Sequence, residues 1–273
     1  MAKINEALNK YLQLCAKFAP IDINVAHREI LAAIKHHDKI KFDPADMKKM
    51  LALHAIWYNS LDADSKNPDY SVYSDPYYFC ETWLCWIKYS KRYLKEIQLS
   101  RSMSDKSIVD YMNNVSSVLD LGCGAGYTTA ELKKIFPKAK VYGTNFEGSS
   151  QFQIAKYLGK KHGFKIFGNH SGIKADLIFA SEYFEHIQAP VEHLMEILKD
   201  CDPEYLLVAN TFNSRAIGHF NEYLHFGNKL SGKETSRLFN ATLNNIGYKK
   251  VITQCWNNRP AFWQKSHAGR LSI

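Results

Sequence analysis

Apolar residues recur at helical spacing through the first hundred positions of the chain. The repeat at Leu8, Leu12 and Cys15 puts three apolar side chains on one face, which predicts an amphipathic helix. The same spacing predicts four long helices, over residues 5–18, 24–37, 44–61 and 77–99. A polar, turn-rich stretch separates the last two, and a shorter helix is predicted over 105–113. This part of the chain is therefore expected to be helical.

Beyond residue 114 the pattern changes to short apolar runs that alternate with amphipathic stretches. Strands are predicted at 117–121, 140–144, 165–167, 176–180 and 205–209. Helices between them are predicted at 127–136, 149–162 and 189–200. Alternation of this kind, with short connections, predicts an α/β fold in which helices cover both faces of a mostly parallel sheet.

The end of the chain has a different pattern. A helix predicted at 233–246 ends at Gly247, a residue type that often terminates helices. Two apolar runs follow, YKKVITQCW and PAFWQK, with only residues 257–259 between them. So short a connection predicts a hairpin, in which the last strand runs antiparallel to the one before it. We therefore divide the chain into a helical extension, 1–104, and an α/β domain, 105–273.

The charge of the chain favours an anionic partner, although its value is not extreme. The 273 residues carry a formal net charge of +8, and the pI is about 9.0. Two predicted helices hold much of the positive charge, and right-handed crossovers bring these helices to the same face of the sheet. Their lysines form either a solvated face or a patch for nucleic acid: Lys133, Lys134, Lys138, Lys156, Lys160 and Lys161.

The composition also indicates a compartment. No stretch approaches the roughly 20 apolar residues that span a bilayer, and the N-terminus lacks the apolar segment of a secretory signal. Six cysteines are scattered along the chain without any C-x-x-C pair. We therefore expect a cytoplasmic protein with reduced thiols, no membrane partner and no metal.

A glycine-rich stretch, SSVLDLGCGAGYTT, lies between the first predicted strand and the helix that follows it. Glycines at this point let the backbone turn sharply and let a ligand approach the main chain. A nicotinamide dinucleotide site would need a third glycine where Tyr127 stands. A phosphate-binding P-loop would need Gly-Lys-Ser/Thr, which does not follow. Both of these ligands are therefore disfavoured.

The stretch resembles the first motif of class I S-adenosylmethionine-dependent methyltransferases, because VLDLGCGAG matches the pattern hh(D/E)hGxGxG at every position. Three further pieces follow in the family's order: VYGTNFEGSSQFQIAKYL, ADLIFASEYFEHIQAPVEHLMEILK and the terminal hairpin. The resemblance implies a seven-stranded sheet in the order 3-2-1-4-5-7-6, with the last strand reversed. It also implies S-adenosyl-L-methionine as the cofactor, with S-adenosyl-L-homocysteine as its product. The methionine end of the cofactor would lie against Asp120, Gly122, Gly124 and Gly126.

The sequence departs from the family where the nucleoside of the cofactor would bind. Asn145, followed by Phe146, occupies the place of an acidic residue that accepts hydrogen bonds from the ribose. Asn169 is the nearest candidate for a second acidic position, near the adenine. A neutral amide accepts a weaker hydrogen bond than a carboxylate does. The resemblance thus assigns these three residues to the cofactor and leaves open a non-catalytic member.

Methyl transfer from a sulfonium is an in-line displacement, for which a protein mainly supplies alignment and a dry pocket. A base helps where the acceptor carries a proton that must be removed. The segment SEYFEHI, after the fourth predicted strand, supplies three candidates for this base: Glu182, Glu185 and His186. Glu182 is also assigned to the cofactor.

Selectivity for the acceptor is expected from the helical extension and from the insert at 215–231, which are both rich in aromatic residues. The residues assigned to the acceptor are Tyr70, Tyr73, Asn213, His219 and Tyr223. The sequence therefore predicts a methyltransferase that acts on a small molecule. A methyltransferase of nucleic acid or protein, and a non-catalytic binding protein, are the alternatives.

Overall fold

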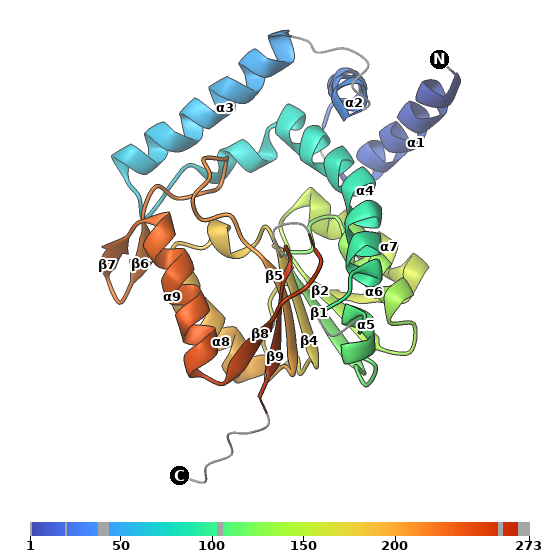
Figure 1. Cartoon of the computed structure of the whole chain (residues 1–273). Helices are drawn as coiled ribbons and strands as arrows, with labels where there is room; N and C mark the ends of the chain where they lie inside the picture. Colours follow the sequence, from blue (N-terminus) through green and yellow to red (C-terminus); the bar gives the residue numbers. More distant parts are fainter. Residues whose placement is uncertain (1, 20, 38–43, 103–105, 256–258, 267–273) are drawn as a thin grey trace.

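A computed structural model of the chain describes residues 2–19, 21–37, 44–102, 106–255 and 259–266 (Figure 1). Within these ranges the molecule has one large sheet, with helices on both of its faces and a further group of helices across one end (Figure 1). Part of the predicted helix at 105–113 and part of the predicted turn at 257–259 lie outside the described residues.

The N-terminal part is helical, as predicted. Its helices are α1 (Ala2–Phe18), α2 (Ile23–His37), α3 (Pro44–Ala63), the short 3-10 helix η1 (Tyr70–Ser74) and α4 (Pro76–Leu99). Asp75 begins α4 because its side chain accepts hydrogen bonds from two backbone amides of the first turn, and Pro76 follows it. The predicted helix at 105–113 is shorter than expected: α5 covers Ile108–Tyr111, behind a capping box at Ser107.

The sheet has seven strands, and its order is β3-β2-β1-β4-β5-β9-β8. Its strands are β1 (Ser117–Leu121), β2 (Lys140–Thr144), β3 (Lys165–Phe167), β4 (Leu177–Ser181), β5 (Tyr205–Ala209), β8 (Tyr248–Val251) and β9 (Ala261–Lys265). The first five pair in parallel, and β9 is antiparallel to both β5 and β8. The predicted strand order, with its reversed last strand, is confirmed.

Helices cover the two faces of the sheet in the way that right-handed crossovers require. One face carries α6 (Tyr127–Ile135) and α7 (Ser150–His162), and the other carries α8 (Pro190–Cys201) and α9 (Gly232–Asn245) (Figure 1). The insert before α9 forms a small hairpin that the sequence pattern did not predict. Its strands are β6 (Tyr223–His225) and β7 (Asn228–Leu230), which makes the two final strands of the main sheet β8 and β9.

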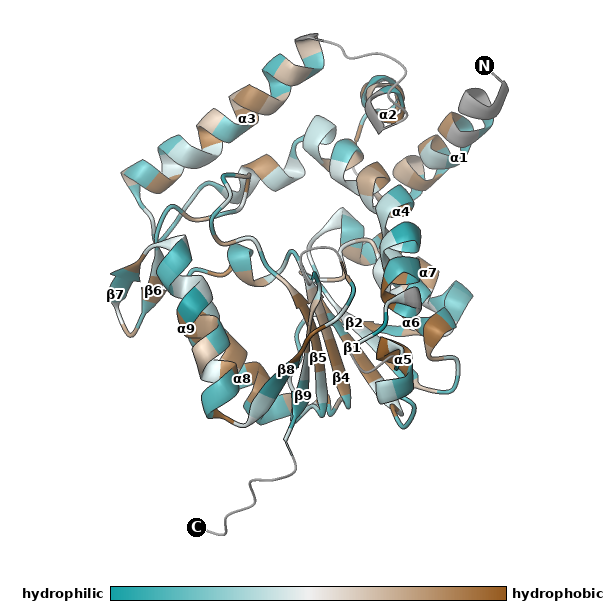
Figure 2. Cartoon of the chain, in the orientation of Figure 1, coloured by the Kyte–Doolittle hydropathy of each residue, from teal (hydrophilic) through white to brown (hydrophobic). Residues whose placement is uncertain are grey.

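Two apolar cores lie on opposite faces of the sheet, and the central strands are correspondingly hydrophobic along their length (Figure 2). On one face, Trp83 of α4 packs in the same core as Val118 of β1, so helices of the extension share this core with α6 and α7. On the other face, Trp57 of α3 belongs to the core that contains Trp263 of β9. Residues 1–104 are thus packed against both faces, and the domain boundary at 104 stays a prediction.

Candidate functional site

The glycine turn after β1 adopts backbone conformations that side chains disfavour. Gly122, Gly124 and Gly126 have φ values of 64°, 54° and 84°, in the left-handed region that glycine enters at little cost. The amide of Cys123 donates to the carbonyl of Thr144 at 2.9 Å, which fixes the turn to the end of β2. The turn then leads directly into α6, whose first amides face the same end of the sheet.

The three glycines make room for different neighbours. A Cβ at Gly122 would lie 2.5 Å from the ring of Tyr183, and one at Gly126 would lie 3.1 Å from the backbone of Ala155 in α7. A Cβ at Gly124 would meet only the end of one flexible side chain, Oε1 of Gln151, at 3.4 Å. Gly122 and Gly126 therefore allow close packing of the protein on itself, whereas Gly124 faces open space.

The resemblance implied that Asp120 lies against the methionine end of the cofactor, but the structure directs its side chain away from the surface of the turn. Its side chain is buried, and Oδ2 accepts hydrogen bonds from the hydroxyls of Thr128 and Thr129, both at 2.6 Å. Burial raises the pKa of Asp120 to about 7, although these two hydrogen bonds oppose the shift. Asp120 therefore holds the first turn of α6 against β1, and its carboxylate is directed inward.

The end of β2 supplies a polar and an apolar group next to Gly124. The side-chain amide of Asn145 donates to the carbonyl of Gly124 at 2.8 Å, and its Oδ1 accepts from the amide of Phe146 at 2.8 Å. Phe146 is 76% exposed, which is unusual for so large an apolar side chain. Asn145 thus braces the glycine turn, and the exposed ring offers a flat surface for a planar ligand.

The turn after β3 lies beside these residues. Asn169 is exposed, and its Oδ1 accepts from the amide of Ser171 at 3.0 Å, which closes a local turn. A Cβ at Gly168 would lie 2.6 Å from Oε1 of Glu147, so the Glu147 side chain rests on this turn. The Glu147 carboxylate therefore lies against the turn that holds Asn169.

Three ionisable side chains meet beyond the end of β4. Glu182, Glu185 and His219 bring their oxygen and nitrogen atoms within 4.8 Å of one another, and we call this group the carboxylate cluster. Glu185 is fully buried, and its Oε1 accepts from the amide of Thr211 at 2.8 Å. Its Oε2 has no hydrogen-bond partner among the described residues. The oxygen and nitrogen atoms of the cluster are also close enough together to ligate a metal ion.

Burial and the neighbouring Glu182 raise the pKa of Glu185 to about 8. Glu182 itself is exposed and has φ of 53°, a conformation that a non-glycine residue rarely adopts. At neutral pH the buried Glu185 therefore retains its proton, and the exposed Glu182 lies on the solvent side of the pair.

His186 is brought to the same place but with different properties. Its Nδ1 forms a hydrogen bond with the hydroxyl of Tyr73, 3.1 Å away, and its ring contacts that of His219 with 4.9 Å between centroids. Burial, and then the nearby His219, lower the pKa of His186 to about 3. The imidazole is therefore neutral at physiological pH and a weak proton acceptor.

Aromatic residues of the N-terminal part cover the cluster. The rings of Trp57, Tyr70 and Tyr73 are in mutual contact, and we call them the aromatic roof. Trp57 is buried and donates from Nε1 to the carbonyl of His219 at 2.8 Å, which ties α3 to the insert. Tyr70 is 53% exposed. The roof is therefore anchored at Trp57 and open to solvent at Tyr70.

Two residues that the sequence assigned to the acceptor lie elsewhere. Tyr223 is fully buried, and its hydroxyl donates to the carbonyl of Glu185 at 3.1 Å, so it supports the carboxylate cluster from behind. Asn213 is exposed and lies against Gly232 at the beginning of α9. The expected contact of Tyr223 with an acceptor was wrong because its apolar neighbours Phe212 and Phe220 enclose its ring.

The sequence reasoning missed three residues at this site. Tyr183 covers Gly122, and its hydroxyl is hydrogen-bonded to Nε2 of His193 at 2.8 Å. Tyr89 of α4 is close to the cluster: burial and Glu182 raise the pKa of its hydroxyl, and Arg259 lowers it. Tyr183 lies within SEYFEHI and could have been found there. Tyr89 and Arg259 are far apart in sequence, and no local pattern connects them.

A seven-stranded sheet of this order, with a glycine turn after its first strand, defines the class I methyltransferase fold. Residues 84–250 match a family model that is described as a methyltransferase domain. This match covers more than half of the chain, and the chain belongs to that family. It is an S-adenosylmethionine-dependent methyltransferase.

One solved structure shares the fold at low sequence identity, and a second is similar to part of the chain. An O-methyltransferase family protein from Burkholderia thailandensis is 11% identical, with a TM-score of 0.53 over 88% of this chain and 72% of that one. The plantazolicin methyltransferase BpumL in complex with SAH is 17% identical, with a TM-score of 0.42 over 62% of this chain and 63% of that one. A search of curated proteins finds no match.

The glycine turn fits the cofactor of this class. Within 4 Å of a Cβ added at Gly124 lies one protein atom, Oε1 of Gln151, and the exposed Phe146 follows Asn145, whose side chain is bonded to Gly124. The amides of Gly124 and Ala125 donate no hydrogen bond to any described residue, so they are available to an anionic ligand group. A carboxylate and a planar base, which are the two ends of S-adenosylmethionine, thus both find complementary groups here.

Proposed function

We propose that this enzyme transfers the methyl group of S-adenosylmethionine to a hydroxyl or amine group of a small molecule. The acceptor would lie below the aromatic roof, with its reacting group at the carboxylate cluster. One observation carries the proposal: an exposed carboxylate, Glu182, is paired with a buried carboxyl group whose pKa is raised to about 8. This pairing suits removal of a proton from an acceptor near neutral pH.

The cofactor residues in this proposal are Gly124, Asn145, Phe146 and Asn169. When bound, S-adenosylmethionine supplies an activated methyl group on a positively charged sulfur. The protein then has to align the acceptor, exclude water and receive the acceptor's proton. Glu182 would accept this proton. The buried Glu185 would keep its own proton, so that the pair carries one negative charge before the transfer.

His186 and Tyr73 have a positioning role in this scheme. A neutral imidazole with a pKa lowered to about 3 is a poor base at pH 7. Its hydrogen bond to Tyr73 instead joins the segment after β4 to the aromatic roof. His186 thereby fixes the distance between the roof and the cluster, which is where the acceptor would be held.

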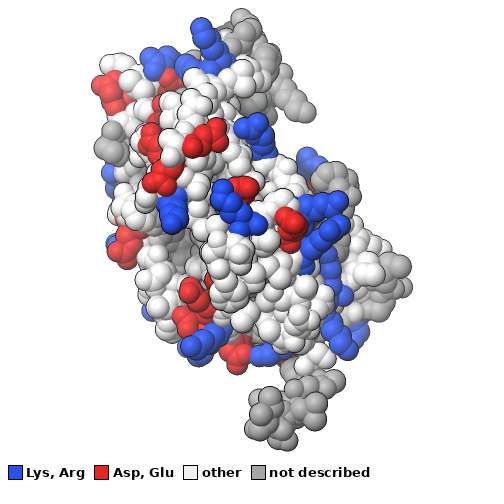
Figure 3. Space-filling view, turned by 90° about the vertical axis from the view of Figure 1, so that its left-hand side faces the viewer, with Lys and Arg blue, Asp and Glu red and all other residues white. Residues whose placement is uncertain are grey.

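The aromatic roof favours a small acceptor over a polymer. Trp57, Tyr70 and Tyr73 present ring faces and edges, and such walls are typical of pockets for small organic molecules. The face that carries α3 and α9 has both acidic and basic side chains, with many of the basic ones along one edge (Figure 3). Its mixed charge is consistent with a small ligand, and the described residues include no helix that is apolar and long enough to span a membrane.

The lysine patch gives less support to a nucleic-acid acceptor. Lys133 donates to the carbonyls of Pro137 and Ala139, and Lys134 forms an ion pair with Glu131 at 2.6 Å. These two lysines therefore stabilise the end of α6 and its exit. Moreover, α6 lies on the side of the sheet opposite to α8 and α9 (Figure 1).

The proposal is tested with the purified enzyme, S-adenosylmethionine carrying a labelled methyl group and an extract of small molecules. Mass spectrometry should detect a labelled product that is one methyl group heavier than its precursor. With that acceptor, Glu182→Gln should lower kcat about 100-fold or more, because general-base contributions are typically that large. The proposal fails if Glu182→Gln keeps more than about a third of the activity.

A chelator distinguishes a proton-accepting pair from a metal centre. If Glu182, Glu185 and His219 act through proton transfer, EDTA leaves the rate unchanged. Loss of activity with EDTA, followed by recovery with a divalent cation, would contradict the proposal. Lys138→Met, in the lysine patch, is the control for substrate class: its rate should equal that of the unaltered enzyme when the acceptor is a small molecule.

A further inference from the structure

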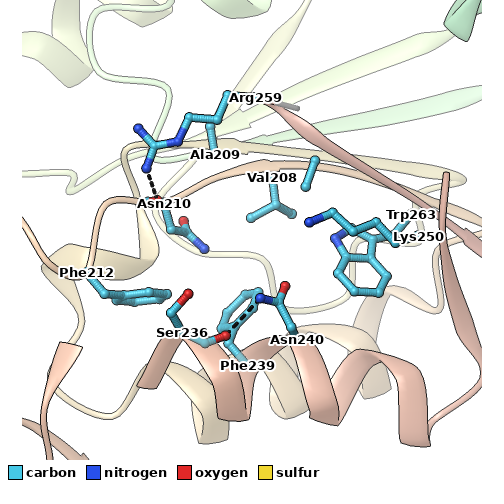
Figure 4. A pocket seen from close by; sticks show the side chains of 11 residues that line it. Val208, Ala209, Asn210, Phe212, Ser236, Phe239, Asn240, Lys250, Arg259 and Trp263 are labelled. Carbon is cyan, nitrogen blue, oxygen red and sulfur yellow. Dashed lines mark hydrogen bonds between the residues drawn. The ribbon is translucent and has the colours of Figure 1, made fainter. Parts of the chain in front are cut away.

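A cavity lies next to the carboxylate cluster. It has a volume of about 180 Å³ and opens between the end of β5, helix α9 and the β8–β9 hairpin (Figure 4). Its lining residues are Val208, Ala209, Asn210, Phe212, Ser236, Phe239, Asn240, Lys250, Arg259, Ala261 and Trp263. Pockets that bind a whole drug-sized ligand have volumes of roughly 300–1,000 Å³. The cavity therefore suits one group of a ligand.

The cavity combines an apolar floor with a polar rim. Trp263 and Phe239 are buried and form much of the floor. Lys250 extends over the Trp263 ring, with Nζ 5.6 Å from its centroid, and points toward the cavity (Figure 4). From the other side, Nη2 of Arg259 donates to the carbonyl of Asn210 at 2.8 Å. Two cationic groups thus face one small space.

No acidic side chain among the described residues lines the cavity or pairs with these two cations. In addition, Oδ1 of Asn210 is buried and lacks a hydrogen-bond partner among the described residues. Cations gathered in a concave site attract an anion, and the free oxygen of Asn210 can accept from a neighbouring O–H or N–H group.

The cavity is joined to the reacting end of the site. Ala209, which lines it, accepts a hydrogen bond through its carbonyl from the amide of Glu182 at 2.8 Å. Arg259 donates to the carbonyl of Asn210, and the amide of the next residue, Thr211, donates to Oε1 of Glu185, so the cavity and the carboxylate cluster meet at the segment after β5. A molecule whose reacting group is at Glu182 can therefore extend a second group toward Arg259 and Lys250.

We propose that this cavity binds an anionic oxygen group, a carboxylate or a phosphate, of the methyl acceptor. That the group belongs to the acceptor rests on the proposed function, whereas anion binding by the cavity does not. Lys250 and Arg259 provide charge-assisted hydrogen bonds, and Trp263 and Phe239 contact the apolar part next to the anion. The acceptor class is thereby narrowed to small molecules with a negative charge.

The experiment measures probe binding by ligand-observed NMR titration of the full chain at constant ionic strength. The probes are benzoate, phenyl phosphate and the neutral benzamide. Benzoate or phenyl phosphate should bind at least ten-fold more tightly than benzamide, and the tighter of the two identifies which oxygen anion the site prefers. Lys250→Met and Arg259→Met should each weaken binding of that probe about ten-fold, because each removes one charge-assisted contact.

Lys249→Met is the matched control. Lys249 is the exposed neighbour of Lys250 on β8, and alternation along a strand directs it to the other face of the sheet. Its loss should change the affinity less than two-fold. Three results would overturn the inference. They are equal binding of the charged and neutral probes, no binding of any probe up to about 10 mM, and an equal loss of affinity in Lys249→Met and Lys250→Met.

The design also separates this inference from the proposed function. Glu182→Gln should leave probe binding unchanged, because Glu182 does not line the cavity. Tight anion binding together with an active Glu182→Gln variant would refute the catalytic role and keep the anion site. A lost anion preference together with an inactive Glu182→Gln variant would refute the anion site and keep the catalytic role of Glu182.

Discussion

The buried carboxyl group of Glu185 should make the stability of this protein depend on pH. The perturbation is Glu185→Gln, which has nearly the same shape and keeps an oxygen for the amide of Thr211. Oε2 of Glu185 has no partner among the described residues, and the NH2 group that replaces it can donate to Glu182. The substitution therefore removes a titrating group and preserves the packing around it.

The magnitude follows from the shift in pKa. Burial and Glu182 raise the pKa of Glu185 from 4.5 to about 8 in the folded state. Between these two values the unfolded chain has released the proton while the folded protein retains it, so the stability falls as the pH rises from 4.5 to 8. At about 1.4 kcal/mol per unit, the loss is at most on the order of 5 kcal/mol. Glutamine has no such proton, and its contribution stays constant.

The assay is urea-induced unfolding at pH 5, 6, 7 and 8 at constant ionic strength. The free energy of unfolding of Glu185→Gln, relative to the unaltered protein, should increase by a few kcal/mol from pH 5 to pH 8. Glu6→Gln, at an exposed position of α1, is the control and should show no such trend. A difference that is independent of pH, or that decreases with pH, would refute the assignment of the proton to Glu185.

Two further predictions concern the glycine turn. Asn145→Asp should lower the free energy of unfolding by about 1–3 kcal/mol, because a carboxylate cannot donate to the carbonyl of Gly124; unchanged stability in urea titration would show that this hydrogen bond is unimportant. Gly126→Ala should lower Tm by several degrees, since its Cβ would lie 3.1 Å from the Ala155 backbone at a φ of 84°; calorimetry that finds no decrease would contradict the close packing of α6 on α7.

The sequence predicted the central sheet well because its signals are local. Apolar runs bounded by turns gave β1, β2, β3 and β5 with their observed bounds, and the glycine turn fixed the position of β1 in the sheet. The β6–β7 hairpin was missed because its strands, YLH and NKL, lie in an insert outside the strand–helix alternation that located the equally short β3. Short elements of this kind depend on tertiary contacts, which one local pattern does not contain.

The candidate site was only partly predictable for a related reason. Glu182 and Glu185 lie within one short segment, so their sequence spacing sufficed to bring them together. The third member of the cluster, His219, comes from the insert, and the roof that covers it comes from α3 and η1. Asp120 was misjudged because its family motif gives a residue type and not the direction of its side chain. Long-range packing therefore decides which motif residues face the ligand.

The claim that S-adenosylmethionine lies against Gly124 is tested most directly by calorimetric titration of two glycine variants. Gly124 and Gly227 both have positive φ values, 54° and 81°, so valine strains the backbone similarly at either position. Protein atoms crowd neither site, but Gly227 lies in the β6–β7 hairpin, away from the proposed cofactor residues. The account predicts that Gly124→Val abolishes the binding heat of S-adenosylmethionine while Gly227→Val retains it. Equal affinities of the two variants would contradict the account.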